Sequence, residues 1–220
     1  QPISEICKYL QDHAAYLHVD AAQGFGKEIL PLRNPRIDLI SISGHKIYAP
    51  KGVGALITRR RSYKRPPIRP LMFGGGQERG LRPGTLPVHL VVGLGRASEM
   101  AGNSWQERAQ TCAAFKQRLL EKLQPLGPKI NGAYERTLPN VINLSFRGVN
   151  SEALMVALKS ELAISNGSAC TSQSYQPSHV LNAMGLDADE TAGAVRISWC
   201  HMSDDPDWAR VSSLIELLLK

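Results

Sequence analysis

The 220-residue sequence lacks several features that would assign it to a membrane, secreted or zinc-binding class. No apolar run approaches the length of a membrane span, because glycine or charge interrupts the longest candidates. The first residues are typical of neither a signal peptide nor an arginine-rich transit peptide. No CxxC pair is present, and the cysteines and six scattered histidines match no zinc spacing. The four cysteines are Cys7, Cys112, Cys170 and Cys200. We therefore expect reduced thiols in a cytoplasmic compartment, no membrane association and no resident metal.

The charge of the chain is unevenly distributed. Its net charge is +7, and much of the excess comes from the stretch RRRSYKRPPIRP at residues 59–70. The prolines there favour a solvated basic loop, and the alternative is a patch for phosphate groups or an acidic partner. Because no base-reading module surrounds the stretch, we do not expect direct nucleic-acid binding.

Short apolar segments alternate with helical ones in the first half of the chain. A helix is expected near residues 3–14, and strands at YLHVDAA, at IDLISIS (37–43) and at GVGALITR. Short buried strands separated by helical segments indicate an α/β layer whose sheet is largely parallel. From residue 87 to about 126 the pattern is helical, with a break expected near residues 102–104.

The second half has a different pattern. VINLSF and AVRISWC are expected to be strands, and SEALMVALKSEL a helix. The last helix is expected to follow Asp204 and Asp205, with Pro206 near its first turn. Core positions at helical spacing are Leu119, Leu120, Leu123, Leu154, Leu158, Leu162, Trp208, Val211, Ile215 and Leu218. We expect an α/β part over residues 1–102 and a separate α+β domain over residues 103–220.

Two polar positions follow buried strands in the first part. Asp20 ends the strand in HVDAAQ, and Lys46 follows the strand in SISGHK. Ligands of open α/β sheets bind beyond the carboxyl ends of the strands. Asp20 could cap the next turn or hold a cationic ring nitrogen. Lys46 could be a solvated surface lysine, or a partly desolvated amine that forms a Schiff base, with Ser43 and His45 as donors to an anion.

Two further candidates come from the second part. Cys170 lies among small residues in NGSACTS, where nothing large shields the thiol, as suits an accessible and reactive cysteine. Arg196, in the strand AVRISWC, could bind a carboxylate through two parallel hydrogen bonds. Its alternative is a strand arginine paired with an acidic residue.

Six motifs together resemble one enzyme family. HVDAAQ, SGHKIYAPKGVGAL, GGGQERGLRPGTLPVH, LPNVINLSF, SNGSACTS and AVRIS occur in the order and with the spacing found in cysteine desulfurases of the NifS/IscS type. These enzymes belong to the class V aminotransferase group and use pyridoxal phosphate, and the SACTS form resembles the iron–sulfur-assembly branch. The resemblance implies the C-terminal part of a fold type I transferase. Residues 1–102 are then part of the large cofactor-binding domain, and residues 103–220 the small domain with the catalytic cysteine loop.

The resemblance also implies how the cofactor is held. Lys46 forms the Schiff base with pyridoxal phosphate and moves the Cα proton, and Asp20 keeps the pyridine nitrogen protonated. Gln23 bonds the phenolic oxygen of the ring. Residues that contact the phosphate are Ser43, Gly44 and His45 in the same chain and Thr85 acting across a homodimer.

The remaining implied roles concern the substrate and the sulfur. Arg196 binds the carboxylate of L-cysteine, and His45 is counted with the catalytic residues. Cys170 attacks the substrate sulfur, which leaves a persulfide on the enzyme and releases L-alanine. A sulfur-acceptor protein for iron–sulfur assembly or for tRNA or DNA thiolation then takes the sulfur. Cys170 is also the candidate for a transient iron–sulfur ligand.

The family pattern includes an N-terminal portion that these 220 residues do not contain. That portion holds a histidine that stacks on the ring, an asparagine and backbone groups for the phosphate, so part of the family's cofactor site lies outside these residues. The alternatives are another class V enzyme, such as a selenocysteine lyase or an aminotransferase, and a non-catalytic fragment that carries sulfur. Cys170 argues against a plain aminotransferase, which needs no thiol.

Overall fold

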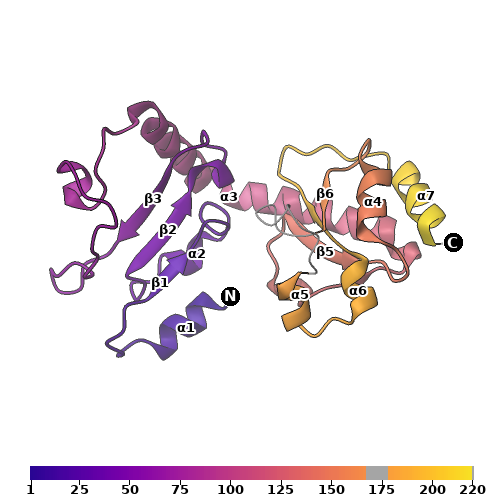
Figure 1. The fold of residues 1–220 in the computed structure, drawn as a ribbon, viewed down its shortest axis with the longest axis horizontal. Helices are drawn as coiled ribbons and strands as arrows, with labels where there is room; N and C mark the ends of the chain where they lie inside the picture. The colour runs from indigo at the N-terminus through magenta and orange to yellow at the C-terminus, as the bar shows by residue number, and fades with distance from the viewer. Residues whose placement is uncertain (167–177, 220) are drawn as a thin grey trace. The chain divides into compact units, whose positions relative to one another are not determined.

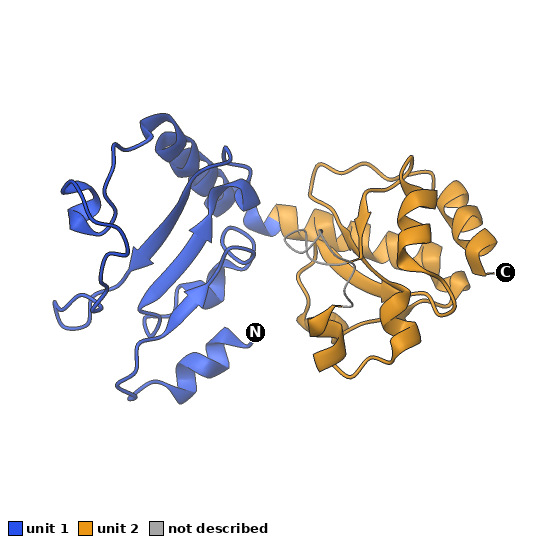
Figure 2. Cartoon of the chain, in the orientation of Figure 1, with its two compact units in different colours: residues 1–106 blue, residues 107–220 orange. Residues whose placement is uncertain are grey.

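The chain forms two compact units, residues 1–106 and 107–220 (Figure 2). The computed structural model describes residues 1–166 and 178–219. The first unit contains α1 (Ile3–Tyr9), β1 (His18–Asp20), α2 (Ile29–Leu32), β2 (Leu39–Ser43), η1 (Gly44–Ile47), β3 (Gly54–Thr58), η2 (Gln77–Gly80) and the first part of α3 (Val88–Leu123). The second contains the rest of α3, η3 (Gln124–Leu126), β4 (Lys129–Ile130), η4 (Tyr134–Arg136), β5 (Val141–Ser145), α4 (Ser151–Leu158), β6 (Ile164–Ser165), α5 (His179–Ala183), α6 (Ala188–Ala192), β7 (Ala194–Ser198) and α7 (Trp208–Leu219) (Figure 1).

The first unit is built on a three-stranded sheet in the order β1-β2-β3. β1 and β2 are parallel, with Asp20 opposite Ser41, whereas β2 and β3 are antiparallel. Because side chains alternate between the two faces of a strand, Val19 and Ile40 share one face. They pack there with the fully buried Cys7 of α1. The expected α/β layer is therefore present, with one parallel and one antiparallel strand pair.

A buried ion cluster closes the N-terminal end of the parallel pair. Asp38, which is 3% exposed, directly precedes β2 and accepts hydrogen bonds from Arg36 Nη1 at 2.9 Å, Arg61 Nη2 at 2.7 Å and the Leu17 amide at 2.7 Å. Burial alone raises the pKa of the Asp38 carboxyl, but the bonds from Arg61, Leu17 and Arg36 outweigh burial and lower that pKa below its usual value. The cluster therefore holds a carboxylate that is ionised and fully engaged.

The same cluster explains two differences from the sequence-based expectations. α1 ends at Tyr9, earlier than predicted, because the carbonyls of Leu10 and His13 accept hydrogen bonds from Arg36. The basic stretch 59–70 is irregular, as predicted, but its Arg61 is half-buried against Asp38 and its Arg59 donates to the Asn34 carbonyl. Part of the positive charge in this stretch is therefore structural.

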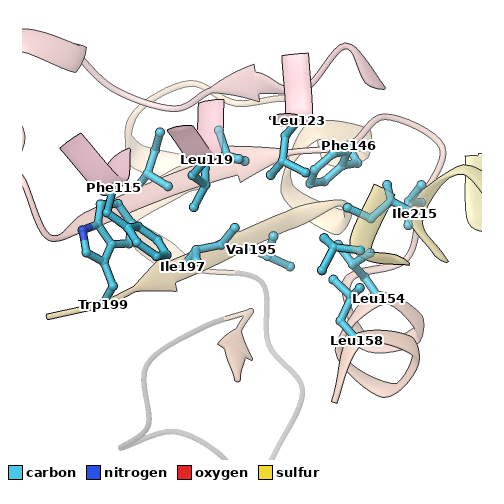
Figure 3. Packing of buried hydrophobic residues seen from close by; sticks show 14 of the residues in the cluster. Phe115, Leu119, Leu123, Phe146, Leu154, Leu158, Val195, Ile197, Trp199 and Ile215 are labelled. Atoms are coloured by element: carbon cyan, nitrogen blue, oxygen red, sulfur yellow. The ribbon is translucent and has the colours of Figure 1, made fainter. Parts of the chain in front are cut away.

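The second unit is built on an antiparallel sheet in the order β4-β5-β7-β6. One face of the sheet carries Ile142 and Leu144 of β5 and Val195 and Ile197 of β7. Side chains of α3, α4 and α7 pack on this face, as Figure 3 shows for Phe115, Leu119, Leu123, Leu154, Leu158 and Ile215. Trp199 closes one end of the core, with its ring centroid 5.2 Å from that of Phe115 and its Nε1 donating to the Cys112 carbonyl. The predicted leucine positions are confirmed as core or as partly buried neighbours of it.

The long helix α3 belongs to both units and runs without a break from Val88 to Leu123. The predicted break near residues 102–104 was wrong. The Ser104 hydroxyl bonds back to the Met100 carbonyl at 2.7 Å, and buried side chains anchor the helix on both sides of this region. Within the described part of the chain, no helix is both long enough and apolar enough to cross a membrane.

Replacing Asp38 with alanine should destabilise the first unit. Removing one partner of a buried ion pair leaves an uncompensated charge and costs about 3–5 kcal/mol. Protection of the β1 and β2 amides against hydrogen exchange should therefore fall by about two to three orders of magnitude. Since the pKa of Asp38 is lowered by folding, its contribution should be complete above about pH 4 and be lost as the pH falls through the folded-state pKa. The exposed Asp12→Ala is the control; equal protection in the two variants would contradict the role of the cluster.

Candidate active site

The parallel pairing of β1 and β2 brings two candidate segments to one edge of the sheet. Asp20 ends β1 and lies opposite Ser41, while Ser43 ends β2 two residues further on. Asp20 is exposed, and its Oδ1 accepts the Ala22 amide at 2.9 Å, so the capping interpretation is correct for one carboxylate oxygen. Within the described residues, Oδ2 makes no hydrogen bond. One oxygen of Asp20 therefore remains available to a cation.

Lys46 lies on the turn η1, and the core holds that turn in place. The Gly44 amide donates to the Val53 carbonyl at 2.9 Å, and Ile47 is buried against Leu94 and Ala97 of α3. Ser43 Oγ and His45 Nδ1 lie 3.0 Å apart, which places a hydroxyl and an imidazole side by side. Lys46 itself is half-buried. Lys46 is therefore only partly solvated, unlike the fully solvated lysine of the surface-turn interpretation.

Gly44 is required where the turn approaches β3. A Cβ at this position would lie 2.9 Å from both the carbonyl oxygen and Cγ1 of Val53, and 3.2 Å from the Ala49 Cβ. At the other end of the turn, Tyr48 has a φ of 70°, a conformation uncommon for residues other than glycine. The turn that presents Lys46 therefore has little freedom to shift.

The other candidates of the first unit lie in loops. Gln23 is exposed in the turn that follows β1, where the Gly24 and Phe25 amides donate to the Ala21 carbonyl. Thr85 is exposed between η2 and α3, with no hydrogen bond from its side chain to the described residues. The sheet edge thus brings together the segments that carry Asp20, Ser43, Gly44, His45 and Lys46, whereas Gln23 follows in the next turn and Thr85 lies in the loop between η2 and α3.

Two polar residues on the same sheet face were missed from the sequence. His18 precedes Asp20 by two residues, and its Nε2 lies 2.7 Å from Ser41 Oγ. Both side chains share the face of Asp20, because His18 is two positions away on β1 and Ser41 is its register partner on β2. The alternation of side chains along HVD and SIS could have predicted it, because every second residue of a strand points to the same face.

Arg196 lies on β7 in the second unit, on the sheet face opposite the core. Its register partners are Asn143 on β5 and Ser165 on β6. The Arg196 side chain is exposed and makes no ion pair or hydrogen bond with any described residue. The alternative of an arginine paired with an acidic residue is therefore absent from the described part of the chain. Cys170 lies outside the described residues.

The remaining cysteines occupy ordinary structural positions. Cys7 and Cys112 are buried, Cys200 follows β7, and none of the three forms a disulfide with a described residue. Burial raises the pKa of the Cys7 thiol, although Arg36 and Arg59 act in the opposite direction. Among the residues that the structure describes, no group of three or more histidine, cysteine or acidic side chains is arranged to hold a metal.

Comparison with known proteins identifies the family. A family model described as Aminotransferase class-V matches residues 1–211. The chain belongs to the class V aminotransferase family. It is 46% identical to a cysteine desulfurase of Pongo abelii over 198 residues, which are 89% of this chain and 43% of that protein.

Two solved structures are similar to this chain in sequence and fold. DndA from Streptomyces lividans is 44% identical with a TM-score of 0.78, over 91% of this chain and 56% of that one. SspA in complex with cysteine is 37% identical with a TM-score of 0.72, over 90% of this chain and 54% of that one. The chain therefore spans about half the length of the relatives it matches. The predicted family and the predicted α/β fold are confirmed.

The class V aminotransferase family depends on pyridoxal phosphate, and the sheet edge of the first unit fits this cofactor. Lys46 supplies an amine on a turn that the core holds, and Asp20 supplies a carboxylate oxygen with no described partner. Ser43 and His45 supply a hydroxyl and an imidazole suited to a phosphate. The donor set therefore matches the aldehyde, ring nitrogen and phosphate of the cofactor.

Replacing Gly44 with alanine should weaken cofactor binding. The new Cβ would overlap Val53 and force the turn away from β3, which moves Lys46. Overpacking of this kind costs about 1–3 kcal/mol, so we expect affinity for pyridoxal phosphate to fall about tenfold, measured by absorbance titration. Gly95→Ala, where a Cβ meets nothing within 4 Å, is the matched control. Unchanged affinity in Gly44→Ala would show that the turn does not position Lys46.

Proposed function

We propose that this chain is the C-terminal part of a cysteine desulfurase, which removes sulfur from L-cysteine and yields L-alanine and an enzyme persulfide. The observation that carries the proposal is the placement of Lys46 on a core-held turn that follows β2 at the sheet edge where Asp20 ends β1. The 46% identity to a cysteine desulfurase supports it, as does the similarity to SspA, whose structure was solved with cysteine. Because the chain spans about half of those relatives, the activity belongs to the longer protein.

In this proposal the residues of the sheet edge hold pyridoxal phosphate. Lys46 binds the cofactor through its amine, and Asp20 pairs with the protonated ring nitrogen. Ser43, Gly44 and His45 contact the phosphate. When bound, pyridoxal phosphate supplies an electron sink for the bonds at the substrate Cα.

Two other contacts to the cofactor come from loops. Gln23 bonds the phenolic oxygen of the ring. Thr85 contacts the phosphate of a neighbouring subunit, so that the protein acts as a two-fold dimer. The glycines of GGGQERGLRPGT support this assignment, because they permit a close approach of the Thr85 loop to another backbone.

The remaining assigned residues act on L-cysteine. Arg196 binds its carboxylate, and Lys46 moves a proton at Cα. The Cys170 thiolate attacks the substrate sulfur, so an S–S bond forms as the C–S bond breaks, and the carbon that loses sulfur takes up a proton to give L-alanine. The persulfide sulfur then passes to the thiol of an acceptor protein in a reducing cytoplasmic compartment.

Borohydride reduction should attach the cofactor irreversibly to Lys46. Lys46 is half-buried on a core-held turn at the same sheet edge as Asp20, whereas Lys51 is exposed in the following turn. Peptide mass spectrometry of the reduced holoenzyme should find the pyridoxyl group on Lys46, and Lys46→Ala should abolish the labelling. A label on Lys51 in the wild-type protein would refute the assignment.

Replacing Cys170 with alanine should stop sulfur transfer without removing the cofactor. Sulfide release from L-cysteine in the presence of a thiol reductant should fall on the order of a hundredfold or more, because the nucleophile is lost. The cofactor absorbance should be retained. Cys200→Ala is the matched control, since Cys200 is partly exposed and Cys7 and Cys112 are buried. Normal sulfide release by Cys170→Ala, or an equal loss in Cys200→Ala, would contradict the proposed nucleophile.

A further inference from the structure

A row of polar side chains crosses the outer face of the sheet in the second unit. The backbone N–H of Asn131, which follows β4, donates to the backbone carbonyl of Asn143 on β5 at 3.0 Å. Asn143 is the register partner of Arg196 on β7, and Arg196 that of Ser165 on β6. Directly opposed side chains of antiparallel strands have Cβ atoms about 4.5–5.5 Å apart. The four side chains therefore form one row, and Arg196 and Asn143 are neighbours within it.

The hydrogen bonds of this row determine which way the Asn143 amide is turned. Ser145 Oγ lies 2.7 Å from the Glu190 carbonyl, and because a carbonyl only accepts, the hydroxyl proton is donated there. Ser145 Oγ must then accept from Asn131 Nδ2, which lies 2.7 Å away. The second hydrogen of Asn131 Nδ2 is donated to Asn143 Oδ1 at 2.6 Å. Asn143 thus presents its oxygen to Asn131, and its NH2 group remains for another partner.

The anchor of this chain of bonds is itself held in place. Glu190, at 4% exposure, is bound through its carboxylate by Lys129 Nζ and Arg147 Nη2, each at 2.6 Å. Its backbone carbonyl therefore offers Ser145 a fixed acceptor. Asn131, which is 7% exposed, leaves its own Oδ1 buried without a hydrogen-bond partner. A buried oxygen without a hydrogen-bond partner lowers the stability of the fold. Stability alone therefore does not account for an asparagine at position 131.

Asn143 and Arg196 both have unengaged donors. Asn143 Nδ2 and the Arg196 guanidinium make no hydrogen bond with any residue in the described part of the chain. On this face, β5 and β7 carry Val141, Asn143, Ser145, Ala194, Arg196 and Ser198, among which there is no carboxylate. Paired donors beside a positive charge favour an anion with two oxygens.

We propose that Asn143 is a second donor to the α-carboxylate of the substrate, beside Arg196, and that Asn131 is the positioning residue that turns its amide. The proposal rests on the proposed function, because it takes L-cysteine as the substrate and Arg196 as its carboxylate ligand. Arg196 supplies charge, and Asn143 supplies a neutral donor of fixed direction. Together they favour an amino acid over the corresponding amine.

Asn143→Asp tests this role, because it changes one end of the side chain only. The aspartate keeps an acceptor for Asn131 Nδ2, but it replaces the outward NH2 with a negatively charged oxygen. Asn143→Ala removes both ends and is the second variant. Asn182→Asp in α5, where the side chain is exposed, is the matched control for the added charge.

The measurement compares L-cysteine with cysteamine, which has the same amine and thiol but no carboxylate. Binding is followed by the absorbance of the bound cofactor in the full-length holoenzyme that carries Cys170→Ala, so that sulfur transfer does not interfere. Asn143→Ala should weaken L-cysteine binding about tenfold and Asn143→Asp about a hundredfold, since a hydrogen bond to a charged group is lost and then replaced by repulsion. Cysteamine binding should stay within about twofold in every variant.

The positioning role of Asn131 is tested by comparing Asn131→Ala in the presence and in the absence of the Asn143 side chain. Asn131→Ala should reduce the preference for L-cysteine over cysteamine in the otherwise unchanged protein, yet have no further effect on it when Asn143 is already alanine. A purely structural role of Asn131 would lower the unfolding temperature without changing that preference, and this result would overturn the positioning role.

The outcomes separate this inference from the proposed function. If the Cys170→Ala holoenzyme binds L-cysteine better than cysteamine, and Asn143→Asp keeps that preference, the role of Asn143 is overturned while the desulfurase proposal stands. If the same holoenzyme gives no spectral response to L-cysteine, the proposed function fails and the inference fails with it. Loss of L-cysteine binding in Asn143→Asp but not in Asn182→Asp is the expected result.

Discussion

The parallel pairing of β1 with β2 is the constraint on which the candidate site depends. Parallel strands place their carboxyl ends at the same edge, so Asp20 and the turn that carries Lys46 come together although 25 residues separate them in the chain. The ion cluster around Asp38 closes the opposite end of the same pair, where Leu17 and Asp38 directly precede the two strands. The ion cluster of Asp38 and the candidate site residues Asp20 and Lys46 thus lie at opposite ends of one strand pair.

The turn after β2 depends on a second constraint, which is close packing. Gly44 allows the backbone to approach Val53, and Ile47 fastens the turn to α3. Between these two contacts lie His45 and Lys46. A lysine in this position is held by its neighbours before any ligand arrives, which reduces the entropy that binding would otherwise cost.

The second unit separates its apolar core from its candidate binding residues by the two faces of its sheet. One face carries the apolar side chains that pack against α3, α4 and α7 (Figure 3). The other carries the row from Asn131 to Ser165, with Arg196 exposed within it. Because alternate residues of a strand point to opposite faces, VINLS and AVRIS each contribute to the apolar core and to the polar row within the same five positions.

Much of this arrangement was predictable from the sequence, because strand alternation, helical spacing and motif order are local patterns. They predicted the strands that end at Asp20 and Ser43, the leucine core of the second unit and the family itself. Local patterns could not predict that α3 continues through residues 102–104, since packing on both sides of this segment overrides the preference of glycine and asparagine. They could not predict that Arg36 ends α1 early, or that the Asn143 amide takes one orientation. Those features depend on partners that are distant in the chain, so only the tertiary structure decided them.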